Sequence, residues 1–261
     1  MKNKKVVVFD MDETLGYFTQ FGVFCDCLDE YFNNPDYSIN NFNNLLDLCP
    51  EFTRPKISYI LNYLKDKKIE KKCYKVMIYT NNQGPKIWAE KIKAYFNNKI
   101  KYQLFDQIIA AFKINGKIVE FGRTSHDKTL DDFFRCTKLP LDVEICFIDD
   151  VHHYNMESDK VYYINVKPYH YSLDFSIFLS RFLDSNLGDN IKHKSKFIHD
   201  LSSIYKHFNF HHEEKDINEQ DIDEIIGKKL FYHIKQFFYE NTNKSIKHNK
   251  KNKKNKTLKR S

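Results

Sequence analysis

The chain has 261 residues, enough for one α/β domain with an appendage or for two small domains. Hydrophobic residues make up 41% and aromatic residues 16% of the sequence, with 7 Gly and 6 Pro, which excludes collagen-like and fully disordered proteins. No apolar run approaches the roughly 18 residues that a membrane-spanning helix needs, so we expect a soluble globular protein without a membrane partner.

Basic residues outnumber acidic ones by 42 to 35, which gives a formal net charge of +7. Residues 241–261 alone hold nine Lys or Arg and no acid, and the rest of the chain has 33 basic against 35 acidic side chains. The positive charge therefore belongs to a low-complexity Lys/Asn tail, which we expect to be disordered because it cannot bury apolar surface. Such a tail can attract nucleic acid, or it can be a solvated end without a partner.

Alternating strand-like and helix-like segments follow the first few residues. Four short runs rich in β-branched and aromatic residues predict strands buried on both faces, at residues 6–9, 74–79, 143–148 and 161–166. Apolar residues at helical spacing lie between these runs. This order predicts an α/β fold, a Rossmann-like open parallel sheet with helices on both faces. The Asn115-Gly116 pair predicts a β-hairpin within IIAAFKINGKIVEFG.

The remaining segments define the domain organisation. Between the first two strands we expect a helix that begins near Ile57 and, before it, at residues 16–50, a loop with one helix at about residues 23–31, which amounts to a minimal cap. A helix at about residues 173–183 would complete the core. Two further apolar stripes at helical spacing predict two amphipathic helices that pack on each other or on the core. The predicted parts are a domain at 1–184, C-terminal helices at 185–240 and a tail at 241–261.

The cysteines and the start of the chain bear on location. The six cysteines show no paired spacing typical of a zinc site. The start, MKNKKVVVFD, passes from a few lysines directly into a strand, unlike a secretory signal peptide. We therefore expect an intracellular, reducing compartment, cytoplasmic or nuclear.

Acidic and hydroxyl side chains directly follow three of the predicted strands. Asp10 and Asp12 follow the first strand, Thr80 follows the second, and Asp149 and Asp150 lie at the end of the third. Because the carboxyl ends of parallel strands meet at one edge of a sheet, we expect these side chains to share a small volume. Four clustered carboxylates repel one another strongly, which favours a divalent metal with oxygen ligands at this edge.

Lys128, in GRTSHDKTLDDF, is the candidate for a further compensating cation. Each acid by itself is explained equally well by a turn or a helix N-cap. The ordered set of a D-x-D, a Thr, a Lys and a D-D, each at its expected place, is far more specific than any of its members.

This ordered set resembles the haloacid dehalogenase (HAD) superfamily of phosphotransferases, which use an aspartate nucleophile. D-M-D-E-T-L, residues 10–15, is similar to the D-x-D-E-T-L of the capless phosphatases related to the RNA polymerase II C-terminal-domain phosphatases and the NLI-interacting-factor proteins. Arg54-Pro55 is similar to that family's R-P-G, with Lys56 in place of the Gly, and INVKPYH also resembles the family. The resemblance covers roughly residues 4–184.

The resemblance implies a role for each matching residue. Asp10 would attack phosphorus and form an aspartyl-phosphate, and Asp12 would act first as general acid and then as general base. Thr80, with Asn81 and nearby backbone N–H groups, would bind the phosphoryl oxygens, and Lys128 would neutralise charge on the nucleophile and the transferring group.

The resemblance also implies a Mg²⁺ ion. Its ligands would be the Asp10 carboxylate, the Asp12 backbone carbonyl, and carboxylates from Asp149 and Asp150, directly or through water. The second residue of this last pair is Asn in some relatives, so Asp150 keeps more negative charge beside the metal.

The substrate follows less directly from the sequence. A short cap predicts an open site and hence a large substrate, a protein or peptide carrying phosphoserine or phosphothreonine. The alternatives are a phosphatase for nucleic-acid ends or nucleotides, which the basic tail would favour, and a non-catalytic interaction protein with the same fold. We expect Trp88 to pack in the core and His126 to stand beside the site without contacting substrate.

Overall fold

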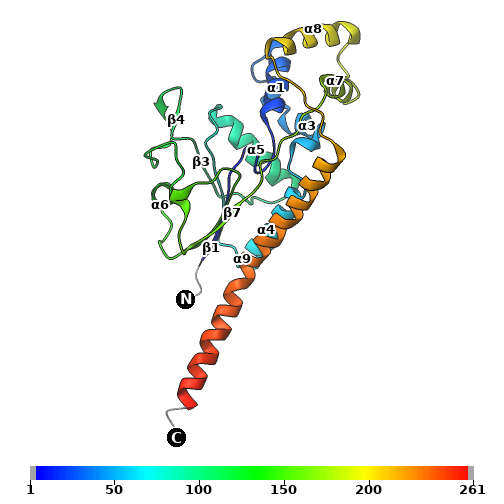
Figure 1. The fold of residues 1–261 in the computed structure, drawn as a ribbon. Coiled ribbons are helices and arrows are strands. Elements are labelled where there is room, and N and C mark those ends of the chain that lie inside the picture. Colours follow the sequence, from blue (N-terminus) through cyan, green and yellow to red (C-terminus); the bar gives the residue numbers. More distant parts are fainter. Residues whose placement is uncertain (1–3, 258–261) are drawn as a thin grey trace.

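Five strands form one parallel sheet at the centre of the protein (Figure 1). The computed structural model describes the backbone of residues 4–257 and the side chains of residues 4–239. The strand order is β3-β2-β1-β6-β7. The strands are β1 (Lys5–Phe9), β2 (Lys75–Tyr79), β3 (Gln107–Ile109), β6 (Glu144–Asp149) and β7 (Val161–Asn165). The predicted α/β class with an open parallel sheet is confirmed.

The edge strand β3 was not among the predicted strands. It has only three residues, and two of them, Ile108 and Ile109, are the first residues of the segment that we assigned to a hairpin. The hairpin itself is present as β4 (Lys113–Ile114) and β5 (Lys117–Ile118). Asn115 and Gly116 both have left-handed backbone angles, with φ of 49° and 77°, as a two-residue turn of this kind requires.

Alternate side chains of the central strands enter two separate cores. Val7 and Phe9 of β1 belong to a large core on one face of the sheet, together with residues of α4 (Ile57–Ile69), α5 (Lys86–Lys99) and α9 (Ile217–Thr257). Val6 and Val8 belong to a smaller core on the other face, with Phe133 of α6 (Leu130–Thr137). Both faces are thus covered, which explains why these strands have no polar alternation.

The insertion between β1 and α4 contains more helix than we expected. In place of one helix at about 23–31, it holds α1 (Thr19–Tyr31), α2 (Tyr37–Asn40), α3 (Phe42–Asp47) and the 3₁₀ turn η1 (Pro50–Phe52). The additional helix α3 is held by aromatic packing, since the Phe42 ring lies 5.2 Å from that of Phe21 in α1. Helix α1 in turn packs on α7 (Phe175–Leu183), where Phe24 stacks on Phe178 with 3.9 Å between ring centroids. A second 3₁₀ turn, η2 (Tyr154–Met156), follows β6.

The C-terminal helices dock on the core, as one of the two expected arrangements requires. Helix α8 (Lys194–His207) packs on α1, and α9 runs along α4 and contacts β7 (Figure 1). Gly227 of α9 permits this approach, because a Cβ atom there would lie 2.4 Å from the carbonyl oxygen of Pro55. Helices 185–240 therefore share the large core with the sheet.

The backbone of α9 continues as a helix to Thr257, with neither Gly nor Pro after Gly227 to interrupt it. The side chains from residue 240 onward and all of residues 258–261 lie outside the described part of the chain. The disorder expected of residues 241–261 therefore stays a prediction.

All six cysteines have free thiols, and five of them are buried. Burial raises their pKa, so they behave as small apolar side chains. In the part of the chain that the structure describes, no helix combines the length and the apolar character needed to cross a bilayer.

Candidate active site

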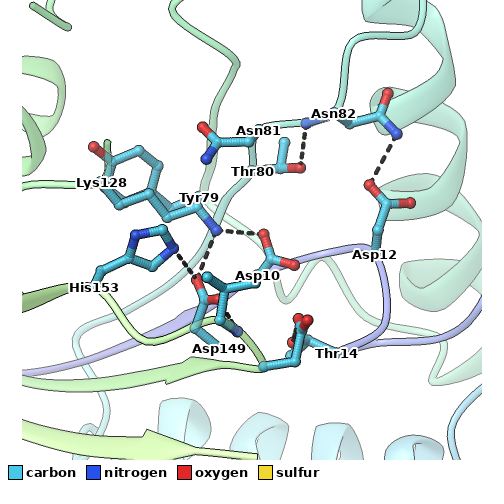
Figure 2. A network of polar contacts seen from close by, with 12 residues as sticks. Asp10, Asp12, Thr14, Tyr79, Thr80, Asn81, Asn82, Lys128, Asp149 and His153 are labelled. Carbon is cyan, nitrogen blue, oxygen red and sulfur yellow. Dashed lines mark hydrogen bonds and ion pairs between the residues drawn. The ribbon is translucent and has the colours of Figure 1, made fainter. Parts of the chain in front are cut away.

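The carboxyl ends of β1, β2 and β6 bring the predicted residues together (Figure 2). The Asp10 N–H donates to the Ile148 carbonyl at 2.8 Å, which extends the pairing of β1 with β6 by one residue and fixes the backbone of Asp10. The Thr80 N–H likewise donates to the Ile109 carbonyl of β3 at 3.0 Å. The functional side chains therefore start from backbone held by the sheet, where positional freedom is small.

Lys128 joins two of the acidic residues. Its Nζ lies 2.7 Å from Asp149 Oδ2 and also contacts Asp10 Oδ1, and the side chain is almost fully buried. The next residue, Thr129, caps α6 by accepting from the Asp132 N–H at 3.0 Å, and its own N–H donates to the Tyr79 hydroxyl at 3.3 Å. The helix cap and strand β2 thus anchor the loop that delivers Lys128.

Three carboxylates form a compact group of oxygen ligands. Asp10, Asp149 and Asp150 each offer one oxygen, and the three oxygens lie within 4.8 Å of one another. The Thr14 hydroxyl donates to Asp150 Oδ1 at 2.9 Å and orients this side chain. With one Lys among three carboxylates, two of them buried, the ionised group carries excess negative charge, so it suits a hard divalent cation.

Burial and charge act in opposite directions on these acids. Burial raises the pKa of Asp10 to about 8, although Lys128 acts to lower it. Burial also acts to raise the pKa of Asp149, but the contacts with His153 and Lys128 outweigh it and hold that pKa below its usual value. Burial acts to lower the pKa of Lys128, but the contacts with Asp10 and Asp149 outweigh it and raise that pKa, so the ammonium form is favoured. A dication bound at the group would act against burial, lower the pKa of Asp10 and so favour its ionised form.

Asp12 faces a different partner from the other acids. Its Oδ2 accepts from the Asn82 side-chain amide at 2.8 Å, on the side of the site away from Asp149 (Figure 2). The Asn82 N–H in turn donates to Thr80 Oγ1 at 3.0 Å. Burial raises the pKa of Asp12. Asn81 lies beside Thr80, and its buried Oδ1 has no hydrogen-bond partner among the described residues.

Two further contacts at the site did not follow from sequence. His153 Nε2 lies 3.5 Å from Asp149 Oδ2, four residues back along the chain. Asn82 binds Asp12 across 70 residues of sequence. A polar side chain next to a motif was the only signal for either residue, and many such residues have no role.

Two buried arginines support the loops around the site. Arg123 donates to the Thr80 carbonyl at 3.2 Å and the Ala110 carbonyl at 2.9 Å, and so ties the ends of β2 and β3 together. Arg54 donates to the Thr14 carbonyl at 2.6 Å and the Lys167 carbonyl at 2.8 Å. Because both arginines bind backbone carbonyls, they hold loop conformation and leave the site's carboxylates free.

Lys56, which stands where the resembling family has Gly, has a left-handed backbone with φ of 66°. Trp88 packs against Phe21 and Phe42, with ring centroids 5.7 and 5.3 Å apart, as expected for a core residue. His126 is exposed, and its ring lies 5.7 Å from that of Phe112.

Comparisons of the chain with protein-family models, with curated proteins and with solved structures give no match. The chemistry of the site therefore has to be inferred from its own residues. These residues provide one buried and one half-buried carboxylate on the loop after β1, a bridging ammonium group and a compact trio of oxygen ligands.

Proposed function

We propose that this protein is a Mg²⁺-dependent phosphatase of the HAD type, which transfers the phosphoryl group of a phosphomonoester to Asp10. One observation carries the proposal: Lys128 bridges Asp10 and Asp149 at the same strand ends where Asp10, Asp149 and Asp150 form the oxygen trio. A protein that only binds partners has no need of this costly cluster of buried charge.

The first chemical step uses the two acids of the loop after β1. A carboxylate oxygen of Asp10 forms a bond to phosphorus while the bond from phosphorus to the leaving oxygen breaks. The proton of the Asp12 carboxyl moves to that leaving oxygen, so the product departs as an alcohol. Burial, which raises the pKa of Asp12, favours the protonated form that this step needs.

The second step regenerates the enzyme. Ionised Asp12 takes a proton from water, whose oxygen attacks phosphorus, and the electron pair of the Asp10–phosphorus bond returns to the Asp10 carboxylate. Thr80 and Asn81 donate hydrogen bonds to phosphoryl oxygens in both steps, and Lys128 offsets their negative charge. The buried Asn81 Oδ1, which has no partner among the described residues, can only accept, so it would bind a donor such as the attacking water while the amino group of the same side chain donates to phosphate.

The donor set fits Mg²⁺, which prefers carboxylate and carbonyl oxygens. Asp10, Asp149 and Asp150 would hold the ion, with the Asp12 backbone carbonyl, and Thr14 would keep Asp150 in place. When bound, the ion would supply Lewis-acid stabilisation of the negative charge on the phosphoryl group.

A protein substrate is the form of the proposal that we favour. The hairpin and the segment after it lie next in sequence to the loop that carries Lys128, and they expose three apolar side chains, Ile118, Val119 and Phe121. Phe121 is 87% exposed and lies close in sequence to two further exposed apolar side chains. Exposed apolar side chains that cluster in this way are typical of surfaces that bind another molecule. A phosphorylated peptide could cover this surface, whereas a small metabolite would not reach it.

Phosphate release from three substrates tests the proposal. A phosphoserine peptide, a nucleoside monophosphate and a 3′-phosphorylated oligonucleotide are each incubated with the protein in Mg²⁺ or in excess EDTA. We expect the peptide to be the best substrate, with activity only in Mg²⁺ and none in Asp10→Asn. Asp131→Asn, an exposed acid on α6, is the matched control and should retain full activity. Preference for the oligonucleotide, with a steep loss of activity in salt, would favour the nucleic-acid alternative.

Activity in EDTA, or activity that survives in Asp10→Asn, would contradict the mechanism. Folded wild-type protein without activity on any phosphomonoester would favour the non-catalytic alternative.

A further inference from the structure

We infer that Asn82 is a positioning residue for Asp12, which sets the carboxyl group of Asp12 at the leaving oxygen. This inference rests on the proposed function and assigns a role to a residue outside the D-x-D, Thr, Lys and D-D set. Its basis is the 2.8 Å contact between Asn82 Nδ2 and Asp12 Oδ2.

The orientation of the Asn82 amide follows from its other contacts. The Gly84 N–H lies 2.8 Å from one terminal atom of the side chain, and an N–H donor requires that this atom be the oxygen, Oδ1. The amino group, Nδ2, must then be the group that faces Asp12. Asn82 therefore donates to the carboxyl group and cannot accept from it.

The backbone of Asn82 is fixed as well. Its N–H donates to Thr80 Oγ1 at 3.0 Å, so the loop is tied to the end of β2 next to the site. Thr80 is 2% exposed and Asn82 is half-buried. With the backbone and the amide oxygen both held, the amino group has little freedom, and a hydrogen bond from it fixes the direction of the Asp12 side chain.

The contact with Asn82 decides which oxygen of Asp12 carries the proton for the leaving group. Because Nδ2 occupies Asp12 Oδ2, the proton for the leaving group has to be carried by Oδ1. In the transfer step this proton passes from Oδ1 to the leaving oxygen as the bond to phosphorus breaks, and the Asn82 hydrogen bond stabilises the carboxylate that results. Other interactions at the site, those of Lys128 with Asp10 and Asp149, do not depend on Asn82.

A leaving-group comparison tests this role. p-Nitrophenyl phosphate and phenyl phosphate have similar rings, but nitrophenolate departs with little need of a proton whereas phenolate needs one. The parameter to compare is kcat/KM, because it reports the transfer step and not the later hydrolysis of the aspartyl-phosphate. We expect Asn82→Ala to lower kcat/KM roughly 10- to 100-fold for phenyl phosphate and less than about 3-fold for p-nitrophenyl phosphate.

Two further variants guard against a purely structural effect. Asn82→Asp keeps the acceptor for the Gly84 N–H but loses the donor to Asp12 and adds a negative charge. It should therefore lower kcat/KM for both esters, with the larger loss for phenyl phosphate. Gln83→Ala removes an exposed amide from the same loop and should leave both substrates unaffected. Equal melting temperatures would show that the loop variants fold like the wild type.

A double-mutant cycle connects the effect to Asp12. In an Asp12→Asn background, Asn82→Ala should lower kcat/KM for phenyl phosphate by less than about 2-fold further, because the group that it positions is already gone. An equal loss on both substrates, or a full loss in the Asp12→Asn background, would overturn the positioning role while leaving the phosphatase proposal intact. Wild-type protein that hydrolyses neither ester would overturn both.

Discussion

Lys128 Nζ lies 2.7 Å from Asp149 Oδ2, and both side chains are almost completely buried at the carboxyl edge of the sheet. The same ammonium group contacts Asp10, so one Lys joins the ends of two neighbouring strands, β1 and β6. Removing one member of a buried ion pair leaves a charge without compensation. The free energy of unfolding should therefore depend on the balance of charge among Lys128, Asp10 and Asp149.

Lys128→Met should destabilise the protein by about 3–5 kcal/mol in EDTA, because two buried carboxylates lose their counter-ion. Mg²⁺ should raise the melting temperature of this variant more than that of the wild type, since the acidic trio then attracts the ion without competition from Lys128. Lys86→Met, an exposed position, is the control. Thermal unfolding with and without Mg²⁺ measures both effects. An identical rise in variant and wild type would contradict competition with Lys128, and no rise in either protein would contradict a metal site at the trio.

Gly227→Ala should destabilise the protein by about 1–3 kcal/mol even though Ala favours helix formation. A Cβ atom at this position would lie 2.4 Å from the Pro55 carbonyl oxygen, so α9 has to move away from α4. Gly22→Ala in α1 is the matched control. Its Cβ would meet the Trp88 ring at an ordinary 3.8 Å, so this change should stabilise by up to about 1 kcal/mol. Urea denaturation measures the free energy of unfolding of both variants. The same change in free energy for Gly227→Ala and Gly22→Ala would show that α9 does not pack tightly on α4.

Glu51→Gln should remove a pH-dependent part of the stability. Burial acts to raise the pKa of Glu51, but hydrogen bonds from Arg181, with N–O distances of 2.7 and 2.9 Å, outweigh it and hold that pKa below its ordinary value of 4.5. A lowered folded-state pKa stabilises above the unfolded value and loses this effect as pH falls through the folded value.

The wild type should therefore be more stable than Glu51→Gln, by about 1 kcal/mol at neutral pH. The difference should start to shrink as pH falls below the ordinary value of 4.5 and be lost once pH is below the folded-state pKa of Glu51. Unfolding free energies from pH 3 to 7 measure this, with Glu30→Gln, an exposed acid on α1, as the control. A difference that is constant over this range would show that the Glu51–Arg181 pair does not contribute through charge.

Phe121→Ser should impair hydrolysis of a phosphopeptide while sparing small aryl phosphates. If the hairpin segment contacts the peptide, losing this exposed ring should lower kcat/KM roughly 10-fold for the peptide only, because contacts far from the phosphate help to stabilise the transition state. Leu141→Ser changes another exposed apolar side chain, just before β6 at the opposite edge of the sheet, and should affect neither substrate. Equal turnover of the peptide by Phe121→Ser and wild type would place the substrate elsewhere.

Much of the fold could be predicted from local sequence. The four predicted strands agree with β1, β2, β6 and β7 to within one residue at each end, because buried parallel strands are continuous apolar runs. The strand ends carried Asp10, Thr80 and Asp149 to one edge, as the rule for parallel sheets requires. The two-residue turn at Asn115-Gly116 likewise depends on neighbouring residues alone, and it is present in the structure.

Other features depend on contacts between distant residues. Strand β3 is too short to give a pattern, and its pairing with β2 decides its structure. The direction of the Asp12 side chain depends on Asn82, and that contact requires the loop after β2 to turn back toward β1. Arg123 binds the carbonyls of Thr80 and Ala110, and no sequence motif indicates which loops a buried Arg will join.

The last helix, α9, completes the core on one face of the sheet, and this affects the order in which the chain folds during synthesis. Leu230, Ile234 and Phe237 of α9 are buried in the same core as Val7 of the first strand. During synthesis α4 and α5 leave the ribosome before α9, so the part of this core that α9 covers stays exposed to water until α9 has been made. A product truncated near residue 184 would keep every acid of the site, but the apolar surface that α9 covers would be open to chaperones and to aggregation with other chains. The large core is therefore complete only after α9 has been synthesised.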